Sequence, residues 1–210
     1  MDHDIQNMRR NYEKAILDVA HTDDSPLVQF KTWFDQAVKA ELPEPNAMIL
    51  ATASPEGQPS ARTMLLKGVD DKGFVFFTNY SSRKGMDIDQ NPKASLLFFW
   101  GELERQIRIE GILERLNNEE NDEYFYTRPI GSQIGAMASP QSKVIESREW
   151  LEERVKQLES AGEPKRPDHW GGFRLIPHQL EFWQGRPSRL HDRIQYVLRD
   201  GNWQRHRLAP

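Results

Sequence analysis

The most informative stretch of the chain runs Leu180-Glu181-Phe182-Trp183-Gln184-Gly185-Arg186-Pro187-Ser188-Arg189-Leu190-His191-Asp192-Arg193. Its glycine and proline favour a chain reversal, because glycine adopts unusual φ values and proline fixes φ. The stretch therefore predicts a strand, a turn and a second strand. Arg189, His191 and Arg193 alternate with period two, so a strand would place all three side chains on one face. Such a cationic face suits a planar anionic ligand, because guanidinium stacks on rings and donates paired hydrogen bonds to phosphate.

Length and composition indicate one globular domain, since 210 residues with 37% hydrophobic and 29% charged side chains can build one sizeable core. The formal net charge of −4 gives no general attraction to nucleic acid, which is therefore not expected as a partner. The absence of cysteine excludes disulfides and is compatible with a reducing compartment. No apolar run approaches the ~18 residues of a membrane helix, so no membrane partner is expected and the cytoplasm is the simplest location. The histidines lack ligand spacing, and no metal is expected.

The order of predicted elements favours a mainly β fold with packed helices. Residues 1–24 are polar and predict a mobile N-terminal arm, and residues 25–210 predict a single domain. Strands are expected at residues 47–52, 60–68, 74–78, 94–100, 105–115, 170–176, 179–184, 189–199 and 203–208. Helices are expected from Pro26 onward and at residues 82–90, 118–126, 131–138 and 147–159. Strands at both ends with helices between them predict one closed sheet, a barrel or a sandwich.

Two clusters of cations lie in the first half of the chain. Arg62 and Lys67 lie on a predicted strand and face opposite sides unless a bulge or a strand end intervenes, so by themselves they are most simply surface cations. Arg83 and Lys84 open a predicted helix behind a serine cap. Cations are unfavourable at a helix N-terminus unless an anion is bound there, and a phosphate is therefore expected at this place.

A third cluster combines Tyr124, Arg128 and Ser132 at a spacing of four residues. This spacing would align them on a helix, but Pro129 and Gly131 interrupt it, so the three side chains are expected to surround a helix end. A phenol, a guanidinium and a hydroxyl are the groups that bind a phosphate monoester.

Many segments of this chain, in the same order, resemble those of the pyridoxine (pyridoxamine) 5′-phosphate oxidases, flavoproteins that make pyridoxal 5′-phosphate. The resemblance runs from about Arg9 to Pro210. It is carried by residues 62–67, 82–84, 104–106, 128–129, 132–136, 170–174 and 207–210, together with the stretch quoted above. It implies an FMN-binding split β-barrel, FMN as cofactor, and a homodimer with both flavins at the subunit interface.

The resemblance also implies roles by position. The residues that resemble the family's FMN contacts by position are Arg62, Thr63, Met64, Leu65, Leu66, Lys67, Phe77, Thr78, Arg83, Lys84, Gln106, Gln141, Ser142, Trp183 and Arg193. The substrate phosphate is expected at Lys67, Tyr124, Arg128 and Ser132, and the substrate ring at Arg189, Leu190 and His191, with an arm of Arg9, Arg10, Asn11 and Tyr12 closing over it. Phe77 stands where some members have a tyrosine, which puts one side-chain hydrogen bond in doubt.

The implied reaction is the FMN-dependent oxidation of pyridoxine or pyridoxamine 5′-phosphate to pyridoxal 5′-phosphate. O2 would accept the electrons and give H2O2, and the amine substrate would release ammonia. Because the flavin carries the electrons, the protein is expected to contribute position and charge. Arg189 and His191 are accordingly expected to be catalytic as orienting groups, without an obligatory base of strongly shifted pKa.

Three other interpretations stay open from the sequence. The same barrel could serve a flavin reductase with a different substrate, because fold does not fix function. A non-catalytic protein could store FMN or carry pyridoxal 5′-phosphate. An isolated Arg-x-His-x-Arg string more often marks an exposed strand edge, and a structural protein with scattered basic residues would show such strings as well.

Overall fold

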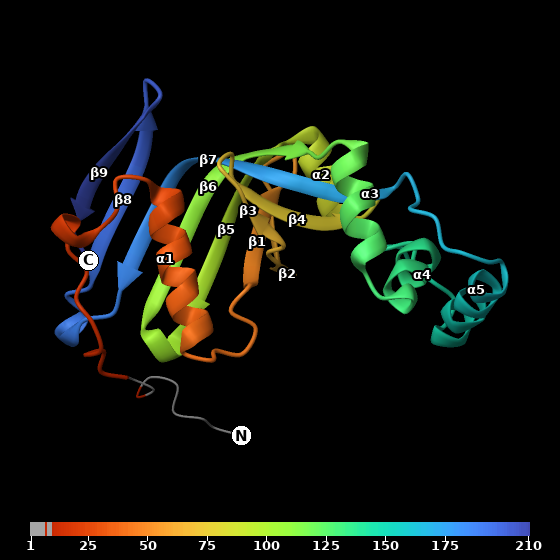
Figure 1. Cartoon of the computed structure of the whole chain (residues 1–210), viewed down its shortest axis with the longest axis horizontal. Helices are drawn as coiled ribbons and strands as arrows, with labels where there is room; N and C mark the ends of the chain where they lie inside the picture. The colour runs from red at the N-terminus through yellow and green to blue at the C-terminus, as the bar shows by residue number, and fades with distance from the viewer. Residues whose placement is uncertain (1–6, 8–9) are drawn as a thin grey trace. The chain divides into compact units, whose positions relative to one another are not determined.

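The computed structural model describes Asn7 and residues 10–210, so Arg9 of the predicted arm lies outside the described residues. The elements follow in the order η2 (Val19–His21), α1 (Pro26–Lys39), β1 (Ala47–Ala53), β2 (Pro59–Leu65), β3 (Gly68–Val69), β4 (Phe74–Asn79), α2 (Arg83–Gln90), β5 (Lys93–Trp100), η3 (Gly101–Leu103), β6 (Arg105–Arg115), α3 (Asn118–Thr127), α4 (Ile130–Ala138), α5 (Arg148–Ser160), β7 (Trp170–Gln184), η4 (Pro187–Arg189), β8 (Asp192–Arg199) and β9 (Asn202–Leu208). The predicted fold class, mainly β with packed helices, is confirmed (Figure 1). None of the helices in the described part of the chain is long and apolar enough to span a membrane.

The described strands form one nine-stranded sheet in the order β2-β1-β5-β6-β7-β4-β3, with β8 paired to β7 and β9. β7 changes partner along its length: residues 170–175 pair antiparallel with β4, and residues 179–184 pair antiparallel with β8. Pro177 lies between these two segments, where its missing N–H interrupts neither ladder. The two strands predicted at 170–176 and 179–184 are therefore one continuous strand.

The chain divides into two compact units. Unit 1 comprises Met1–Met48, Leu96–Glu110 and His178–Pro210, and unit 2 comprises Ile49–Ser95 and Gly111–Pro177. The strands β1, β5, β6 and β7 contribute residues to both units. The single domain predicted over residues 25–210 stays a prediction.

Unit 1 has a core between α1 and the strands of the sheet. Phe30 and Trp33, one turn apart on α1, pack with centroid distances of 5.2 Å on Phe98 and Phe182 respectively. Edge-to-face contacts of this kind add to the burial of apolar area. The other buried apolar side chains of unit 1 include Ala37, Met48, Leu96, Ile107, Ile109, Leu180, Ile194 and Tyr196.

Part of the predicted N-terminal arm is fastened to unit 1. The Leu17 side chain is buried, and its N–H donates to the Asp192 carboxylate at 3.1 Å. The Tyr196 hydroxyl donates to the Asp23 carbonyl at 2.7 Å, and Arg205 donates to the Thr22 carbonyl at 2.6 Å. These bonds attach residues 17–23 to β8 and β9. The mobility predicted for residues 1–24 stays a prediction.

Unit 2 carries the helices α2 to α5. α3 begins with a capping box, in which Asn117 accepts from the Glu120 N–H and Glu120 accepts from the Asn117 N–H. Further along α3, the buried Asn121 accepts from the Gly172 N–H at 2.7 Å and so joins the helix to β7. The apolar core of unit 2 includes Leu50, Phe74, Phe76, Ile88, Leu113, Phe125, Ile134, Phe173 and Leu175.

The helix predicted at residues 147–159 is confirmed as α5, but its packing prediction is wrong. The stripe of Trp150, Leu151, Arg154, Val155 and Leu158 at helical spacing predicted a helix packed on the barrel. No residue of α5 is buried. The stripe is only half-buried, because α5 lies beside α4 at the end of unit 2 (Figure 1).

The common face predicted for Arg189, His191 and Arg193 is also wrong. Pro187 opens the short helix η4, and Ser188 and Arg189 have left-handed backbone with φ values of 55° and 61°. Left-handed backbone cannot continue a β ladder, so β8 begins only at Asp192. Of the three side chains, only Arg193 belongs to a strand. β8 and β9 pair antiparallel through a tight turn at residues 200–201.

A methyl group at Gly85, in the first turn of α2, would lie 2.1 Å from the Tyr80 carbonyl oxygen. We expect Gly85→Ala to lower the free energy of unfolding by about 1–3 kcal/mol, the usual range for overpacking. The matched control is Gly131→Ala in α4, where a methyl group would meet nothing within 4 Å. That variant should gain about 0.5–1 kcal/mol from helix propensity. Urea denaturation measures both, and equal effects would contradict the steric account.

Candidate functional site

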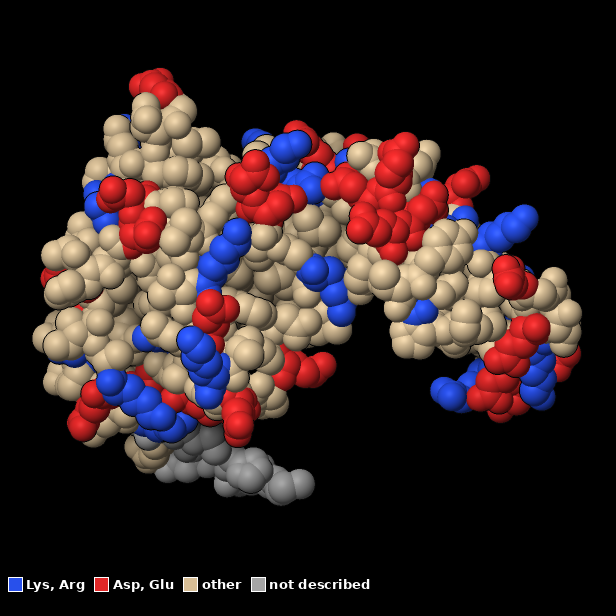
Figure 2. All heavy atoms as spheres, viewed as in Figure 1, with Lys and Arg blue, Asp and Glu red and all other residues tan. Residues whose placement is uncertain are grey.

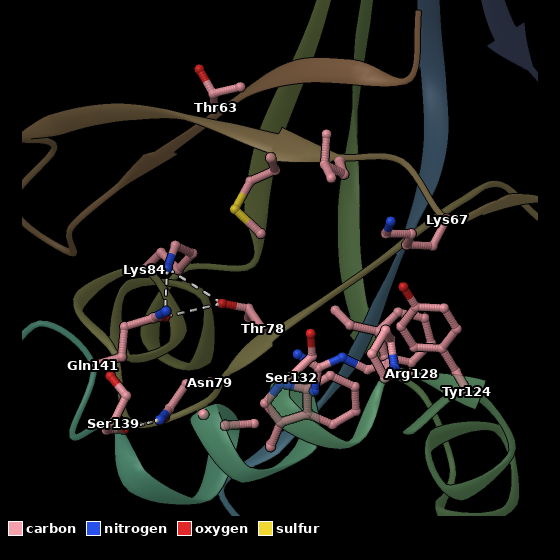
Figure 3. A pocket seen from close by; sticks show the side chains of 17 residues that line it. Thr63, Lys67, Thr78, Asn79, Lys84, Tyr124, Arg128, Ser132, Ser139 and Gln141 are labelled. Atoms are coloured by element: carbon pink, nitrogen blue, oxygen red, sulfur yellow. Dashed lines mark hydrogen bonds between the residues drawn. The ribbon is translucent and has the colours of Figure 1, made fainter. Parts of the chain in front are cut away.

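Unit 2 contains a cavity of about 660 Å³ that brings together β2, β4, α2 and the junction of α3 with α4 (Figure 3). Its lining includes Thr63, Met64, Leu65, Lys67, Phe77, Thr78, Lys84, Tyr124, Arg128, Ser132 and Gln141, all predicted from the sequence. These residues come from five separate segments of the chain. The structure therefore places much of the predicted cofactor set and the predicted phosphate set around one volume.

One side of this cavity is formed around Lys84. Its Nζ donates to Gln141 Oε1 at 2.9 Å and to Thr78 Oγ1 at 3.3 Å (Figure 3). It also donates to Ser82 Oγ at 3.4 Å, and all three partners are neutral groups. Burial, with a smaller contribution from nearby Arg62, lowers the pKa of Lys84. A half-buried ammonium without a carboxylate among these partners is stabilised by a bound anion.

The N-terminus of α2 lies at the same side. Ser82 caps the helix, and its Oγ accepts from the Gly85 N–H at 3.3 Å, as predicted. Lys84 follows within the first turn, where the helix dipole disfavours a cation and favours an anion. Arg83 is exposed and does not line the cavity among the described residues.

The other side of the cavity is formed by Lys67, Tyr124, Arg128 and Ser132 (Figure 3). α3 ends at Thr127, and Arg128 lies in extended backbone between α3 and α4, so the predicted arrangement around a helix end is confirmed. The Arg128 guanidinium lies 4.6 Å from the ring centroid of Trp170. Its Nη1 is buried and has no hydrogen-bond partner among the described residues. Because buried donors are normally paired, this atom fits a ligand that brings an acceptor.

Aromatic rings form a wall of the same cavity. Phe77 stacks on Tyr124 with a centroid distance of 3.9 Å and an interplanar angle of 18°, and on Trp170 at 5.4 Å and 12°. Near-parallel rings give a flat apolar surface suited to a planar ligand. Phe77 contributes through ring stacking, for which a hydroxyl is not needed.

The segment 62–67 divides its side chains between the cavity and the body of unit 2. The Arg62 guanidinium donates to the Leu50 carbonyl at 3.1 Å, to Thr52 Oγ1 at 2.9 Å and to Ser60 Oγ at 2.8 Å, outside the cavity lining. The Leu66 side chain is buried in the core. Lys67 lies two residues beyond the end of β2 and continues the alternation of Thr63 and Leu65, so it reaches the cavity from the face opposite to Arg62.

Unit 1 contains a second cavity, of about 460 Å³, lined by Arg10, Asn11, Tyr12, Arg186, Ser188, Arg189 and His191. The Tyr12 ring contacts Trp183 and His191 at centroid distances of 5.8 Å and 5.9 Å, and the Trp183 and His191 rings lie 4.6 Å apart. Arg10, Asn11 and Tyr12 of the arm are thus brought together with residues of the quoted stretch within unit 1, as the resemblance implied.

The protonation of His191 is set by a main-chain hydrogen bond. The Arg186 N–H donates to His191 Nδ1 at 3.1 Å, so Nδ1 is the acceptor and Nε2 carries the proton of the neutral ring. Burial and, second, the charge of Arg189 lower the pKa of His191. His191 therefore presents an N–H donor from Nε2.

Some predicted residues line neither cavity among the described residues: Arg62, Leu66, Arg83, Gln106, Ser142, Trp183, Leu190 and Arg193. Trp183 still contacts His191, as described above. Arg193 is held by Glu181 through bonds of 2.9 Å from Nε and from Nη2, and it donates to the Ala209 carbonyl at 2.9 Å. Leu190 is 69% exposed.

Other lining residues were not among the predicted site residues, although several lie in the segments that carry the resemblance: Asn79, Pro129, Gly135, Ala136, Ser139 and Trp170 in unit 2, and Arg186 and Ser188 in unit 1. Asn79, Pro129 and Arg186 are sequence neighbours or near neighbours of predicted residues, which was the signal available for them. Trp170 lies about forty positions beyond Arg128 along the chain, and only the pairing of β7 with β4 brings it there.

The face of the molecule drawn in Figure 2 is mixed in charge. In Figure 2, acidic side chains gather over α3, and lysines and arginines are interspersed with acids over the rest of the face shown. The cations of the two cavities thus act locally, as expected for a chain with a net charge of −4.

The antiparallel sheet with its packed helices defines the class of split β-barrel proteins, and solved structures share this fold. PhzG from Burkholderia lata 383, in complex with tetrahydrophenazine-1-carboxylic acid, matches with a TM-score of 0.88 and 33% identity over 93% of this chain and 98% of that chain. A pyridoxamine 5′-phosphate oxidase-related, FMN binding protein from Nostoc punctiforme PCC 73102 has the same fold, with a TM-score of 0.70 at 18% identity, covering 90% of this chain and 100% of that chain.

Residues 34–161 match the family model described as pyridoxamine 5′-phosphate oxidase, and residues 170–210 match the pyridoxine 5′-phosphate oxidase C-terminal dimerisation region. The pyridoxine/pyridoxamine 5′-phosphate oxidase of Paraburkholderia xenovorans (strain LB400) is 57% identical over 98% of this chain and 99% of that protein. Its counterpart in Trichormus variabilis (strain ATCC 29413 / PCC 7937) is 53% identical over 100% of both. The chain belongs to the pyridoxamine 5′-phosphate oxidase family, and it is an enzyme of the oxidoreductase class.

We expect His191 to titrate below its ordinary pKa of about 6.5, because burial and Arg189 both disfavour the imidazolium. Protonation of Nδ1 also breaks its bond from the Arg186 N–H. The folded-state pKa is depressed, so the stability from this group is complete above pH ~6.5 and is lost as the pH falls toward the folded value. Nitrogen-15 NMR should show the Nε2–H tautomer at neutral pH.

The variant Arg189→Met is the informative comparison for this titration. It removes a positive charge and should raise the pKa of His191 part of the way back, because only the second cause of the shift is lost. A folded-state pKa at or above about 6.5 in the unaltered protein would contradict the account.

Proposed function

We propose that this protein is an FMN-dependent oxidase that converts pyridoxine 5′-phosphate or pyridoxamine 5′-phosphate to pyridoxal 5′-phosphate. O2 is the electron acceptor and gives H2O2, and the amine substrate also releases ammonia. The proposal includes a homodimer with FMN at the interface and a place in the cytoplasm. It transfers to this chain the activity named for relatives that are 53% and 57% identical over nearly its whole length.

The observation that carries the proposal is the pair of cationic groups on two sides of one cavity. Lys84 lies on one side with neutral partners, and Arg128 lies on the other, where its buried Nη1 has no hydrogen-bond partner in the described part of the chain. Two separate cations that pair with no carboxylate of the described residues suit two phosphate groups, one from FMN and one from the substrate. The near-parallel rings of Phe77 and Tyr124 suit the planar parts of such ligands.

The residues around Lys84 fit the FMN phosphate. The ammonium, the Thr78 hydroxyl and the free N–H groups of α2 are donors, and the Gln141 amide completes that side. When bound, FMN supplies the hydride-accepting ring and passes the electrons to O2. The task of this side of the cavity is to hold the cofactor by its charge and to fix its position. The other contacts proposed for FMN are Arg62, Thr63, Met64, Leu65, Leu66, Lys67, Phe77, Arg83, Gln106, Ser142, Trp183 and Arg193.

The substrate side uses orientation and charge. Lys67, Tyr124, Arg128 and Ser132 form the proposed cradle for the substrate phosphate. Arg189, with Leu190 beside it, and His191 are proposed to hold the substrate ring, and the Nε2–H of His191 is a donor already fixed by the Arg186 N–H. Holding two flat reactants in a fixed geometry lowers the entropic part of the barrier. The arm from Arg9 to Tyr12 is proposed to close over this ring.

The proposed homodimer draws support from the C-terminal part of the chain. Residues 170–210 match the model described as a dimerisation region. In the proposal, the unit 1 residues Arg189 and His191 meet the unit 2 cavity when two subunits associate, and the reactants are enclosed between them.

Anaerobic mixing tests the function directly. FMN-loaded protein is mixed with pyridoxine 5′-phosphate or pyridoxamine 5′-phosphate while the flavin absorbance is followed. We expect loss of the oxidised flavin band with at least one vitamer, and H2O2 in stoichiometric amount once O2 is admitted. The matched control is unphosphorylated pyridoxine, which lacks the group that Arg128 binds. If neither phosphorylated vitamer reduced the flavin, a different substrate or a carrier role would replace the proposal.

We expect Arg128→Ala to weaken binding of the phosphorylated substrate by about 1.5–3 kcal/mol, or about 10- to 150-fold, because a charge-assisted contact is lost. The measurement is KM for the phosphorylated vitamer, with flavin content as a check on the cofactor side. Arg148→Ala on α5 is the control, since Arg148 is exposed and pairs only with Glu152 among the ion pairs of the described residues. An unchanged KM for Arg128→Ala would show that the cradle is misplaced.

A further inference from the structure

Glu104, a buried residue of unit 1, binds the N-terminal arm through its carboxylate. The Glu104 side chain is only 3% exposed, and its Oε2 accepts from the Glu13 N–H at 2.9 Å and from the Lys14 N–H at 3.0 Å. The main chain of Glu104 also binds Gly185, because the Glu104 carbonyl accepts from the Gly185 N–H at 2.7 Å. Glu104 therefore links the arm to the start of the loop that carries His191.

Glu104 is held rigidly in this role. It is the C-cap of η3, in left-handed backbone with φ of 56°, and its own N–H donates to the Gly101 carbonyl. Its carbonyl also accepts from Gln184 Nε2 at 3.2 Å, and that residue accepts at Oε1 from Arg105 at 3.0 Å. A non-glycine residue in left-handed backbone is strained and persists where its surroundings fix it.

The position of Tyr12 depends on this anchor. Tyr12 directly precedes the two residues whose N–H groups Glu104 binds, and its ring contacts Trp183 and His191. A Cβ at Gly185 would lie 2.7 Å from Tyr12 Cβ and 3.0 Å from Glu104 Cβ, so the ring fits only because residue 185 is glycine.

Other bonds hold the arm farther from Tyr12. Arg186 donates to the Ala15 carbonyl at 3.1 Å, and Asp192 accepts from the Leu17 N–H at 3.1 Å. Lys14 also donates from Nζ to the Glu102 carbonyl at 2.6 Å. The bonds to Ala15 and Leu17 fix the later part of the arm, whereas the two at Glu104 act on the main chain next to Tyr12.

We propose that Glu104 is a positioning residue, whose carboxylate holds the main chain at Glu13 and Lys14 so that Tyr12 covers His191 and Trp183. This inference rests on the proposed function where it concerns substrate, because Tyr12 then forms part of the enclosure around the substrate ring. Glu104 itself touches no reacting atom. It acts through the position of Tyr12, and its loss affects KM for the phosphorylated vitamer more than kcat.

The first test needs no substrate. FMN-loaded protein is treated with trypsin, and cleavage after Lys14 is followed by mass spectrometry. We expect Glu104→Ala to be cleaved about tenfold faster or more, because two charge-assisted hydrogen bonds to the arm are lost. Glu104→Gln should be intermediate, since it keeps an acceptor oxygen without the charge. The matched control is Glu102→Gln in the same short helix, which keeps the carbonyl that accepts from Lys14.

The second test is a double-mutant cycle on KM. Glu104→Ala should raise KM about tenfold in the unaltered background and have little effect in a Tyr12→Ala background, because it acts through that ring. Independent, multiplicative effects would overturn the positioning role, as would trypsin cleavage at the unaltered rate. Since cleavage is read without turnover, it tests the anchor even where neither vitamer is oxidised.

A second variant covers the case in which Glu104→Ala does not fold. Gly185→Ala leaves the carboxylate intact but places a methyl group against Tyr12. It should also speed cleavage after Lys14 and raise KM, with circular dichroism and the unfolding midpoint as checks on folding. Unaltered cleavage and unaltered KM in a folded Gly185→Ala protein would likewise overturn the proposal.

Discussion

Positive charge without a carboxylate partner is the constraint on which the unit 2 site depends. Lys84 donates to neutral oxygens, and Arg128 keeps a buried Nη1 without a partner among the described residues. Elsewhere in unit 2 a cation is paired with carboxylates: Arg174 forms ion pairs with Asp70 at 2.6 Å and with Glu120 at 2.8 Å. A half-buried cation without a charged partner is unfavourable, and a bound anion removes this cost. The unpaired cations therefore favour an anionic ligand in the cavity.

The fold leaves these charges unpaired by placing them where elements end. Lys67 follows the last residue of β2, Lys84 lies in the first turn of α2, and Arg128 separates α3 from α4. Side chains at such positions are held in place by the rigid elements on both sides. Unit 1 follows a related rule, because His191 lies in the loop between η4 and β8 and is oriented by the Arg186 N–H.

In unit 1 the two buried glutamates, Glu181 and Glu104, bind different kinds of partner. Glu181 binds Arg108 and Arg193, and breaking such a buried set by removing one member is costly. Glu104 instead binds main-chain N–H groups of the arm. Glu181 therefore fixes arginine side chains on the sheet, whereas Glu104 fixes a segment of main chain beside a cavity.

The sequence by itself determined the helices, most strand ends, the fold class and the identity of the cationic clusters, because period, caps and turn residues act over a few positions. It did not determine that β7 is continuous through Pro177, that Arg189 adopts left-handed backbone, or that α5 stays unburied. Those outcomes depend on which strands pair and which faces find neighbours, and both involve residues far apart in the chain. The tertiary structure alone decided that Arg62 is engaged by the body of unit 2 while Lys67 and Arg128 reach the cavity, since contacts across long sequence separations select among cations that look alike in the sequence.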